Sequence, residues 1–263
     1  MSEFNYNDLG VSIDGYVATV EIQRPPHNYF DVDLINQIAD AYAQLDLMEQ
    51  CRAIVLCAQG KNFCAGANFG AGDAGDVKDN SSGRLSNNIY RQAVRIFSCQ
   101  TPVVAAVQGA AIGGGLGVAV SADFRVTCPE GRFSSNFTKL GFHPGFGLTV
   151  TLPELIGKQR AALMCLTSRR IKGEQATEWG LADVCVPLAE VRQTAQALAA
   201  EIAGCAPLAV VSTRATLRHG LAERVARQTD HELAEQNELR NTADWEEGIK
   251  AAAERREPNF SGA

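Results

Sequence analysis

The sequence predicts an α/β fold that ends in a helical C-terminal region. Two short and predominantly apolar runs, residues 53–58 and 102–108, have the composition of fully buried strands. Each run is followed by a loop of small residues, and from about residue 189 onward the apolar spacing becomes helical. The 263-residue chain is long enough to bury a sizeable interior as one domain with appendages.

Further elements are expected in order along the chain. Residues 11–22 are expected to form a hairpin that turns at Asp14 and Gly15. Asp31 can cap a helix, because apolar side chains recur on one face of the residues that follow it. A further strand is expected at 124–127, and helices are expected at 191–203, 207–218, 221–240 and 245–255.

The composition argues against several kinds of partner. A net charge of −6 makes a nucleic-acid partner unlikely for this surface, and no apolar run approaches the ~20 residues of a membrane span. Only four histidines are present and they are widely spaced, so no metal site is expected. Eight cysteines without a Cys-x-x-Cys pair, and no signal peptide, predict reduced thiols in a cytoplasmic protein.

The most informative segment is the buried run at 102–108 with its continuation into three glycines, Gly113, Gly114 and Gly115. Amides at a helix start have no intrahelical partner, and the helix dipole favours negative charge there. The arrangement suits an oxyanion. A dinucleotide-binding Gly-x-Gly-x-x-Gly pattern fails, because Gly113-x-Gly115 is followed by Val118. Close helix packing through small residues is the remaining alternative.

A second loop of small residues, 61–69, follows the other buried strand. The two loops could each offer one amide to the same carbonyl oxygen. Here the sequence resembles the crotonase (enoyl-CoA hydratase/isomerase) family. Residues 61–68 resemble its (A/S)-G-(A/F)-D loop, and residues 102–123 resemble its P-V-I-A-A-V-x-G-x-x-x-G-G-G segment. Further matches lie at 24–28, 140–145 and 244–260, so the resemblance covers almost the entire chain.

The resemblance implies a crotonase-like spiral of ββα units over residues 1–188. Residues 189–263 would form a helical region that completes the pocket and builds a homotrimer or a dimer of trimers. The implied substrate is a small-molecule acyl-CoA of the kind found in fatty acid metabolism. Coenzyme A would enter as part of the thioester, with no prosthetic group. Ala67 and Gly114 would supply the two oxyanion amides, and one such donor is typically worth about 3–4 kcal/mol in the transition state.

The sequence departs from the family where the hydratases carry their catalytic glutamates. Gly117 and Phe137 stand at those two positions, and Gly145 stands where some isomerases place an acid. Hydration needs a water held between a proton acceptor and a proton donor. Glycine and phenylalanine can do neither, so standard hydration is not expected.

Other residues are candidates for the missing acid or base. His143 lies in the loop that borders the acyl pocket in relatives, and an imidazole titrates near neutrality. The alternative is that His143 has no catalytic role and is a loop histidine that is hydrogen-bonded to the backbone or faces solvent. Aspartates on the glycine-rich stretch 70–83 could reach the acyl group, although solvated turn residues are the simpler interpretation; they are Asp73, Asp76 and Asp79. Cys64 lacks an adjacent basic partner and is interpreted as a packing residue.

An acidic protein needs local cations to bind the phosphates of coenzyme A. The resemblance implies that Arg24, Lys61 and Ala65 contact coenzyme A, and so does Phe260, which lies near Arg255 and Arg256 at the C-terminus. The alternative for each of these cations is that it is an ordinary surface charge with no role in binding. Four phenylalanines indicate an apolar acyl pocket with aromatic walls, and their alternative role is packing in the core; they are Phe69, Phe137, Phe142 and Phe146.

Three functions remain open at this point. The first is an acyl-CoA enzyme in which two amides stabilise a thioester enolate for isomerisation, decarboxylation, carbon–carbon cleavage or a hydration with a relocated base. The second is an acyl-CoA thioester hydrolase whose water is activated by His143. The third is a non-catalytic subunit that binds CoA esters. The intact oxyanion elements favour the first.

Overall fold

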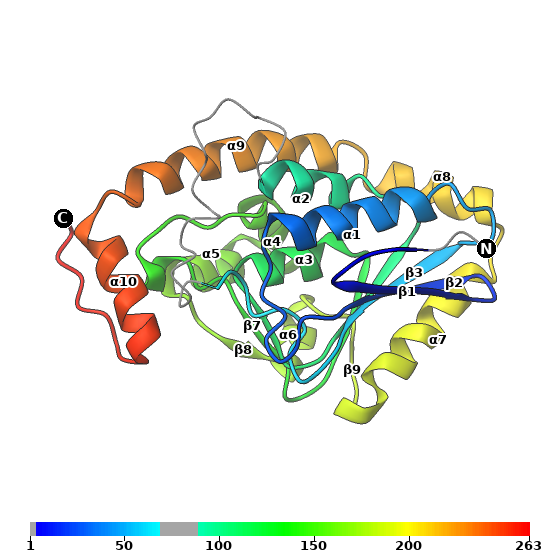
Figure 1. Ribbon diagram of the computed structural model, residues 1–263, viewed down its shortest axis with the longest axis horizontal. Coiled ribbons are helices and arrows are strands. Elements are labelled where there is room, and N and C mark those ends of the chain that lie inside the picture. Colours follow the sequence, from blue (N-terminus) through cyan, green and yellow to red (C-terminus); the bar gives the residue numbers. More distant parts are fainter. Residues whose placement is uncertain (1–3, 69–88) are drawn as a thin grey trace.

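A computed structural model describes residues 4–68 and 89–263 (Figure 1). Its main sheet has six strands in the order β1-β2-β3-β4-β6-β9. The β1–β2 pair is antiparallel and the other neighbours are parallel. The strands are β1 (Leu9–Asp14), β2 (Val17–Ile22), β3 (Ala53–Ala58), β4 (Val103–Val107), β6 (Phe124–Thr127) and β9 (Val184–Cys185). The predicted hairpin and the three predicted strands are confirmed, and so is the α/β class.

Helix α1 (Val32–Leu45) begins where the sequence predicts. Asp31 is its N-cap, and one carboxylate oxygen accepts the Leu34 N–H at 2.8 Å. Its apolar face is fully buried against the sheet and α2 (Ile89–Phe97), which is the next helix that the structure describes. Because β3 and β4 run parallel, their carboxyl ends meet at the same edge, and the two candidate loops leave from that edge.

A second, smaller sheet was not expected from the sequence. It contains β5 (Ala110–Ile112), β7 (Arg132–Ser134) and β8 (Ile171–Lys172), with β5 and β7 parallel. Strands of two or three residues are too short to leave a periodic signal. This sheet leads directly into α3 (Gly114–Ser121), because β5 ends one residue before Gly113.

Helices make up most of the rest of the chain. After a 3-10 turn at Thr138–Leu140 come α4 (Leu148–Ile156), α5 (Lys158–Thr167) and α6 (Gly173–Trp179). A second 3-10 turn, Leu188–Glu190, precedes the C-terminal helices α7 (Val191–Ala203), α8 (Pro207–Leu217), α9 (Leu221–Leu239) and α10 (Ala243–Glu254). All four C-terminal helices that the sequence predicts are present, with ends shifted by at most two residues.

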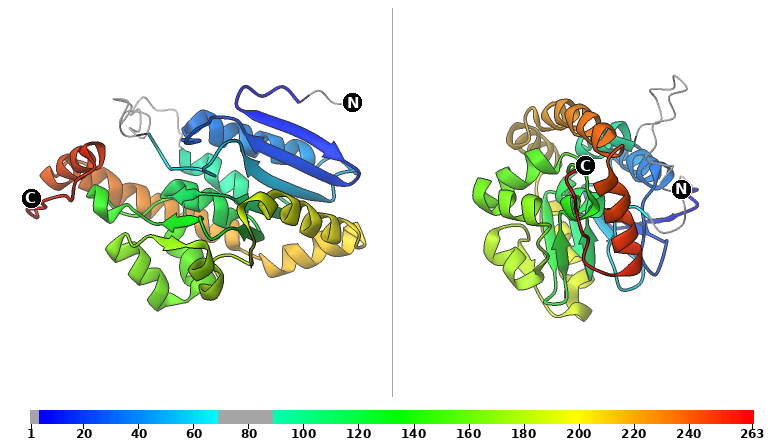
Figure 2. Two further views of the ribbon diagram at one scale, coloured as in Figure 1. Left: turned by 90° about the horizontal axis from the view of Figure 1, so that it is seen from below. Right: turned by 90° about the vertical axis from the view of Figure 1, so that its left-hand side faces the viewer.

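The two faces of the main sheet are covered by different helices. Helices α1, α2 and α3 share one large core with alternate strand residues. Helix α7 covers the other face, where Val55, Val104 and Val126 pack against Ala195 and Ala199. Helix α10 lies at one end of the long axis and the β1–β2 hairpin at the other (Figures 1 and 2). The division at residue 188 stays a prediction.

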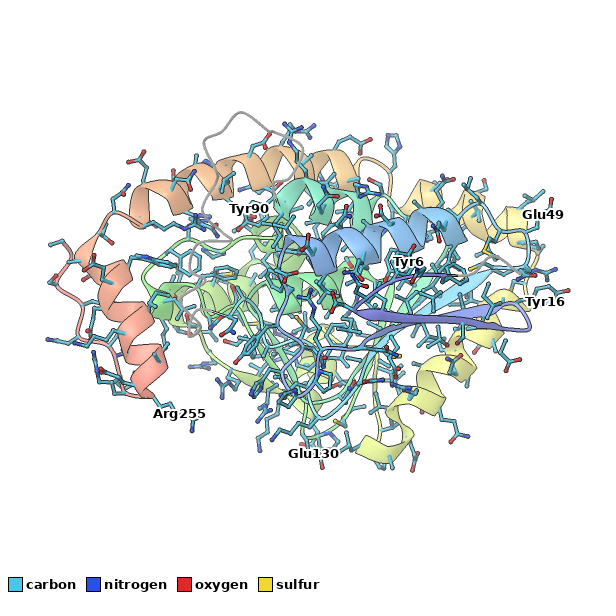
Figure 3. All side chains as sticks on the ribbon, viewed as in Figure 1. Tyr6, Tyr16, Glu49, Tyr90, Glu130 and Arg255 are labelled. Carbon is cyan, nitrogen blue, oxygen red and sulfur yellow. The ribbon has the colours of Figure 1, made fainter. Side chains whose placement is uncertain are left out.

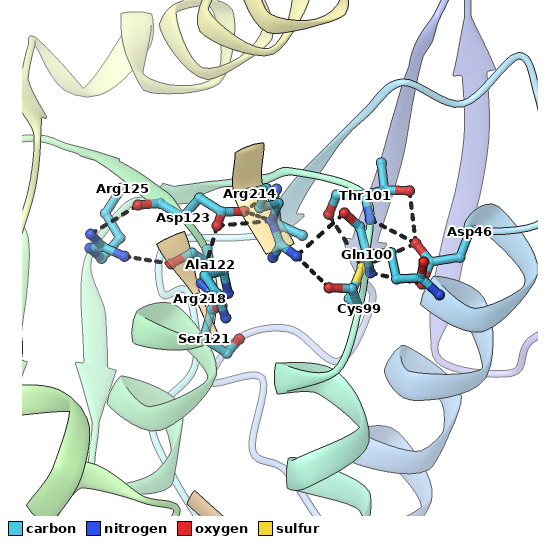
Figure 4. A network of polar contacts seen from close by, with 11 residues as sticks. Asp46, Cys99, Gln100, Thr101, Ser121, Ala122, Asp123, Arg125, Arg214 and Arg218 are labelled. Atoms are coloured by element: carbon cyan, nitrogen blue, oxygen red, sulfur yellow. Dashed lines mark hydrogen bonds and ion pairs between the residues drawn. The ribbon is translucent and has the colours of Figure 1, made fainter. Parts of the chain in front are cut away.

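A buried ionic network attaches α8 to the sheet (Figure 4). The Asp123 carboxylate accepts the Arg214 Nε–H at 2.8 Å, the Arg218 Nη1–H at 3.1 Å and the Val103 N–H at 2.8 Å. Arg125, which is 2% exposed, donates to the carbonyls of Leu181 and Ala122. The network gives Asp123 a structural role.

A search of the described helices for membrane spans finds no single helix that is both long and apolar enough. One pair, residues 188–203 with 207–217, passes together by length and composition, and it is bent by 106°.

Candidate active site

The loop that follows β3 and the segment that leads into α3 are joined to each other by main-chain hydrogen bonds. The Cys64 N–H donates to the Ala110 carbonyl at 2.9 Å, and the Ile112 N–H donates to the Cys64 carbonyl at 3.1 Å. Gly115 allows this close approach, because a Cβ there would collide with the Cys64 carbonyl. The loop after β3 and the start of α3 therefore form one unit.

Main-chain bonds fix the loop on its other side as well. The Ala65 N–H donates to the His27 carbonyl at 3.0 Å, and the Phe30 N–H donates to the Gly66 carbonyl at 3.0 Å. Asn28, which is fully buried, donates from Nδ2 to the carbonyls of Gln59 and Asn62. Ala67 follows Gly66 and is paired with Phe30 as an isolated bridge.

Helix α3 starts at Gly114, with Gly113 as its N-cap at a φ of 56°. The Gly113 N–H donates to the Ser134 carbonyl at 2.8 Å, so the second sheet sets the direction of the helix start. The Gly114 N–H, being first in the helix, has no intrahelical partner. Across the described ranges, no loop or turn carbonyl accepts the N–H of Ala67 or of Gly114.

Both residues line one cavity of about 330 Å³. Its wall is largely apolar and aromatic, and Phe137, Phe142 and Phe146 belong to it, as the sequence predicts. Ala65 lines the same cavity. Phe69 lies outside the described residues. The structure thus brings three of the predicted site residues, Ala65, Ala67 and Gly114, to one place.

Other side chains occupy the space beside Gly117 and Gly145. A Cβ on Gly117 would lie 2.5 Å from Phe146 Cδ1, and Phe146 is itself held at a φ of 63°. A Cβ on Gly145 would lie 2.6 Å from Gln236 Nε2 and would collide with the Tyr90 hydroxyl. Among the cavity-lining residues that the structure describes, none is a carboxylate or a histidine.

The structure does not place His143 among the residues that line this cavity. Its Nδ1 lies 2.7 Å from the Pro144 carbonyl, and because a carbonyl can only accept, Nδ1 carries the proton. The ring packs edge to face on His231, with centroids 5.9 Å apart. A catalytic role for His143 stays a prediction.

The other candidate acids and nucleophiles differ in their placement. Asp73, Asp76 and Asp79 lie outside the described residues. Cys64 is 1% exposed, and burial raises the pKa of its thiol to about 12, so it is protonated at neutral pH. This agrees with its interpretation as a packing residue.

Arg24, Lys61 and Phe260, which are expected to bind coenzyme A, are not part of the cavity lining. Arg24 is paired with Asp8 and Asp31, each at 2.7 Å, so a phosphate would compete with two carboxylates. Lys61 is exposed and is not part of the cavity lining. Phe260 lines a neighbouring hollow that shares Phe142 with the cavity. Their contacts with coenzyme A stay predictions.

The C-terminal arginines have different surroundings. Arg255 lies at the end of α10 and lines the cavity. Arg256 is paired with Glu247 and Glu254. Figure 3 shows Arg255 at the C-terminal end of α10. Tyr90, on α2, lies well away from that end of the helix.

Sequence reasoning missed several polar residues of the cavity, among them Tyr90, Asn136 and Gln236. Tyr90 and Gln236 are 146 positions apart and are brought together by the packing of α2 against α9. A tyrosine or a glutamine on the buried face of a helix does not indicate, from the sequence alone, which residue of another helix it will contact. Only a contact between the two helices reveals it.

One turn before Gln236, the fully buried Glu232 holds the loop that precedes α4. Its carboxylate accepts the Gly147 N–H at 2.8 Å, the Thr149 N–H at 3.2 Å and the Thr149 hydroxyl at 2.5 Å. Burial raises the pKa of Glu232, and these hydrogen bonds and the charge of His143 act against that rise.

Comparison with known proteins places this fold and cavity in a family. The sequence model of the enoyl-CoA hydratase/isomerase family matches residues 12–263. A probable enoyl-CoA hydratase of Rhodobacter capsulatus is 31% identical over 259 residues, covering 98% of this chain and 99% of that protein. A 1,2-epoxyphenylacetyl-CoA isomerase of Escherichia coli is 29% identical over 253 residues, covering 94% of this chain and 95% of that protein.

A solved structure agrees with the sequence matches. The crystal structure of an enoyl-CoA hydratase/isomerase from Pseudoalteromonas atlantica superposes with a TM-score of 0.86 at 27% identity, covering 97% of this chain and all of that chain. The fold is that of a family of acyl-CoA-processing enzymes. The chain belongs to the enoyl-CoA hydratase/isomerase family, the crotonase superfamily.

Proposed function

We propose that this protein binds an acyl-CoA thioester in the 330 Å³ cavity and stabilises its enolate with the main-chain N–H groups of Ala67 and Gly114. The observation that carries the proposal is that these two residues, from different strand–loop units, line one cavity. Removing an α-proton from a thioester puts negative charge on the carbonyl oxygen. Two fixed amide donors in an apolar cavity stabilise that charge with little reorganisation.

The cavity lining supports a reaction other than standard hydration. Gly117 and Phe137 supply no acid or base, and Phe146 fills the space beside Gly117. We therefore favour isomerisation or another reaction that passes through an enolate, as a lyase or isomerase on acyl-CoA. The similarity to an Escherichia coli 1,2-epoxyphenylacetyl-CoA isomerase agrees with this choice.

A CoA-ester-binding subunit without catalysis is the second candidate. One observation favours it: no carboxylate or histidine is found in the described part of the cavity lining. A thioester hydrolase dependent on His143 has less support, because that imidazole is not part of the lining. Coenzyme A belongs to the substrate in each case, and no prosthetic group is proposed.

The proposal extends to a cytoplasmic homotrimer or dimer of trimers. An apolar hollow of about 590 Å³ beside α8 supports an assembly, since residues of α8, α4 and β6 line it. On the same helix, Leu208 and Leu217 are 86% and 80% exposed. Exposed leucines beside an apolar hollow are typical of a covered surface.

Exchange of the α-protons tests the enolate. Saturated butyryl-CoA is incubated in D₂O with the purified protein, and the α-proton signal is followed by NMR. We expect enzyme-dependent exchange that Ala67→Pro slows about 10²–10³-fold, because proline removes one donor. Ala67→Ser, which keeps the N–H, is the control. Binding of butyryl-CoA without exchange would support the non-catalytic subunit instead.

A further inference from the structure

A second hollow, which we name the rear hollow, adjoins the wall of the cavity. It has a volume of about 360 Å³, and Leu239, Phe260 and Ala263 are among the residues that line it. Of the lining residues that the structure describes, only Phe142 belongs to both the cavity and the rear hollow. Phe142 is 4% exposed. Its side chain therefore separates the two spaces.

An aromatic wall leads from the candidate oxyanion amides to Phe142. Phe137 lies close to the start of α3, because a Cβ on Gly113 would be 3.7 Å from Phe137 Cζ. Phe142 packs edge to face on Phe137, with ring centroids 5.2 Å apart. An acyl chain that starts at Ala67 and Gly114 and follows this wall therefore meets the Phe142 ring.

The Phe142 ring is held from more than one side. Trp245, on α10, packs edge to face against it, with ring centroids 4.7 Å apart. The Phe142 N–H donates to the Phe137 carbonyl at 3.2 Å, which closes the turn that carries the ring. The ring thus has partners on the cavity side and on the α10 side, and it forms a fixed wall.

Two glycines let this turn pack directly on α10. A Cβ on Gly141, which has a φ of 80°, would collide with the Asp244 carbonyl. A Cβ on Gly248 would collide with the main chain of Leu140. Because main chain meets main chain at both glycines, the wall cannot move aside unless α10 moves with it.

The residues that follow α10 form the outer side of the rear hollow. They run back beside α10 in Figure 1, and the Asp244 carboxylate accepts the N–H groups of Ser261 at 2.7 Å and Gly262 at 2.9 Å. The Asp244 N–H donates to the Ala263 carbonyl at 3.2 Å. Phe260, in the same segment, adds an aromatic lining. The rear hollow is therefore a predominantly apolar space that suits a hydrocarbon chain.

We propose that Phe142 is a specificity-determining residue that limits the length of the acyl chain by closing the cavity off from the rear hollow. This inference rests on the proposed binding of an acyl-CoA thioester in the cavity. A volume of about 330 Å³ is small for a ligand site, since such sites span roughly 300–1,000 Å³, and it has to hold the thioester as well as the acyl group. Without the ring, the rear hollow would extend the same space by about 360 Å³.

Chain length increases affinity only where the additional hydrocarbon is buried. Each buried methylene strengthens binding about fourfold, which corresponds to about 0.8 kcal/mol. Octanoyl-CoA has four more methylenes than butyryl-CoA. With Phe142 in place these methylenes find no further apolar space, whereas the rear hollow would bury them once the ring is removed.

Dissociation constants of butyryl-CoA and octanoyl-CoA, measured by calorimetry, test the proposal. In the wild type we expect the two thioesters to bind within about threefold of each other. In Phe142→Ala we expect octanoyl-CoA to bind at least about tenfold more tightly than butyryl-CoA. Phe142→Leu keeps a smaller apolar side chain and is expected to give an intermediate ratio.

Two further substitutions show whether the effect belongs to this wall and this hollow. Phe124→Ala is the matched control, because Phe124 is 37% exposed on β6 and lines neither the cavity nor the rear hollow; it is expected to keep the wild-type ratio. Leu239→Trp places a larger side chain in the rear hollow. Combined with Phe142→Ala, it is expected to return the ratio toward that of the wild type, and an undiminished octanoyl-CoA advantage would overturn the assignment of this hollow.

The remaining outcomes separate this inference from the proposed function. An octanoyl-CoA advantage of tenfold or more in the wild type would overturn the inference. A merely structural role of the ring would weaken both thioesters equally in Phe142→Ala and leave their ratio unchanged, which would also overturn it. If Phe142→Ala does not fold, Phe142→Leu decides. If neither thioester binds the wild type, the proposed function fails as well, whereas butyryl-CoA binding with an unchanged ratio in the variants overturns only this inference.

Discussion

Phe146 fills the space beside Gly117 of helix α3. A Cβ built on Gly117 lies 2.5 Å from Phe146 Cδ1 and 2.7 Å from Phe146 Cβ. Phe146 is 1% exposed and also packs on Phe30, with ring centroids 5.9 Å apart. A side chain could enter at position 117 only if this ring moved, so the glycine at 117 is coupled to the packing of the loop.

This coupling predicts a strong interaction between the two positions. Gly117→Ala is expected to lower the free energy of unfolding by about 1–3 kcal/mol through overpacking. In a Phe146→Ala background, the same change is expected to cost much less, because the ring is gone. Urea denaturation of the four proteins measures the coupling. Gly204→Ala is the control, since its Cβ would meet nothing closer than 3.4 Å; additive effects at 117 and 146 would contradict the prediction.

Asp123 provides a second prediction. Its carboxylate is 13% exposed and faces Arg214 and Arg218. Asp123→Asn turns an acceptor into a group that carries N–H donors against two cations, so we expect a loss of about 3–5 kcal/mol in urea denaturation. Glu154→Gln breaks an exposed pair with Arg224 and is expected to change stability by less than about 1 kcal/mol. Equal effects of the two variants would refute the structural role of Asp123.

Glu232 makes stability depend on pH. Its pKa is raised by folding above the ordinary value of 4.5, so the folded state binds more protons than the unfolded chain above that pH. The contribution is therefore full below pH 4.5 and is lost as pH rises toward the folded-state pKa. We expect the unfolding free energy of the wild type, relative to Glu232→Gln, to fall as pH rises from 4.5. Chemical denaturation at several pH values measures this, and a rising difference would show that the pKa is lowered instead.

The sequence was sufficient to predict elements with a long apolar pattern or a strong local signal. The hairpin, the cap at Asp31, the buried strands and the four C-terminal helices are all of this kind. The short strands β5, β7 and β8 were missed, because two or three residues cannot show a period. A buried arginine, Arg125, is not expected from the composition of a buried strand. It is explained by its hydrogen bonds to the carbonyls of Leu181 and Ala122 and by its ion pair with Asp183.

Some residues of the candidate site could also be predicted from local sequence, and others could not. Ala65, Ala67 and Gly114, which local motifs indicate, line one cavity, because the conformation of such turns depends on neighbouring residues; their role in binding stays a prediction. Tyr90 and Gln236 could not be located, since their meeting depends on how two distant helices pack. The predicted role of His143 came from its place in a loop, and the loop bends its ring away from the lining residues toward His231.

The bridge between Cys64 and Ala111 is made of backbone N–H and C=O groups, which every residue except proline possesses. Surrounding side chains, apart from the required glycine at 115, can therefore be exchanged while the distance between the two loops is preserved. A library of variants at the aromatic wall positions would sample new acyl groups on an unaltered frame, which makes this chain a suitable starting scaffold for engineered thioester catalysts.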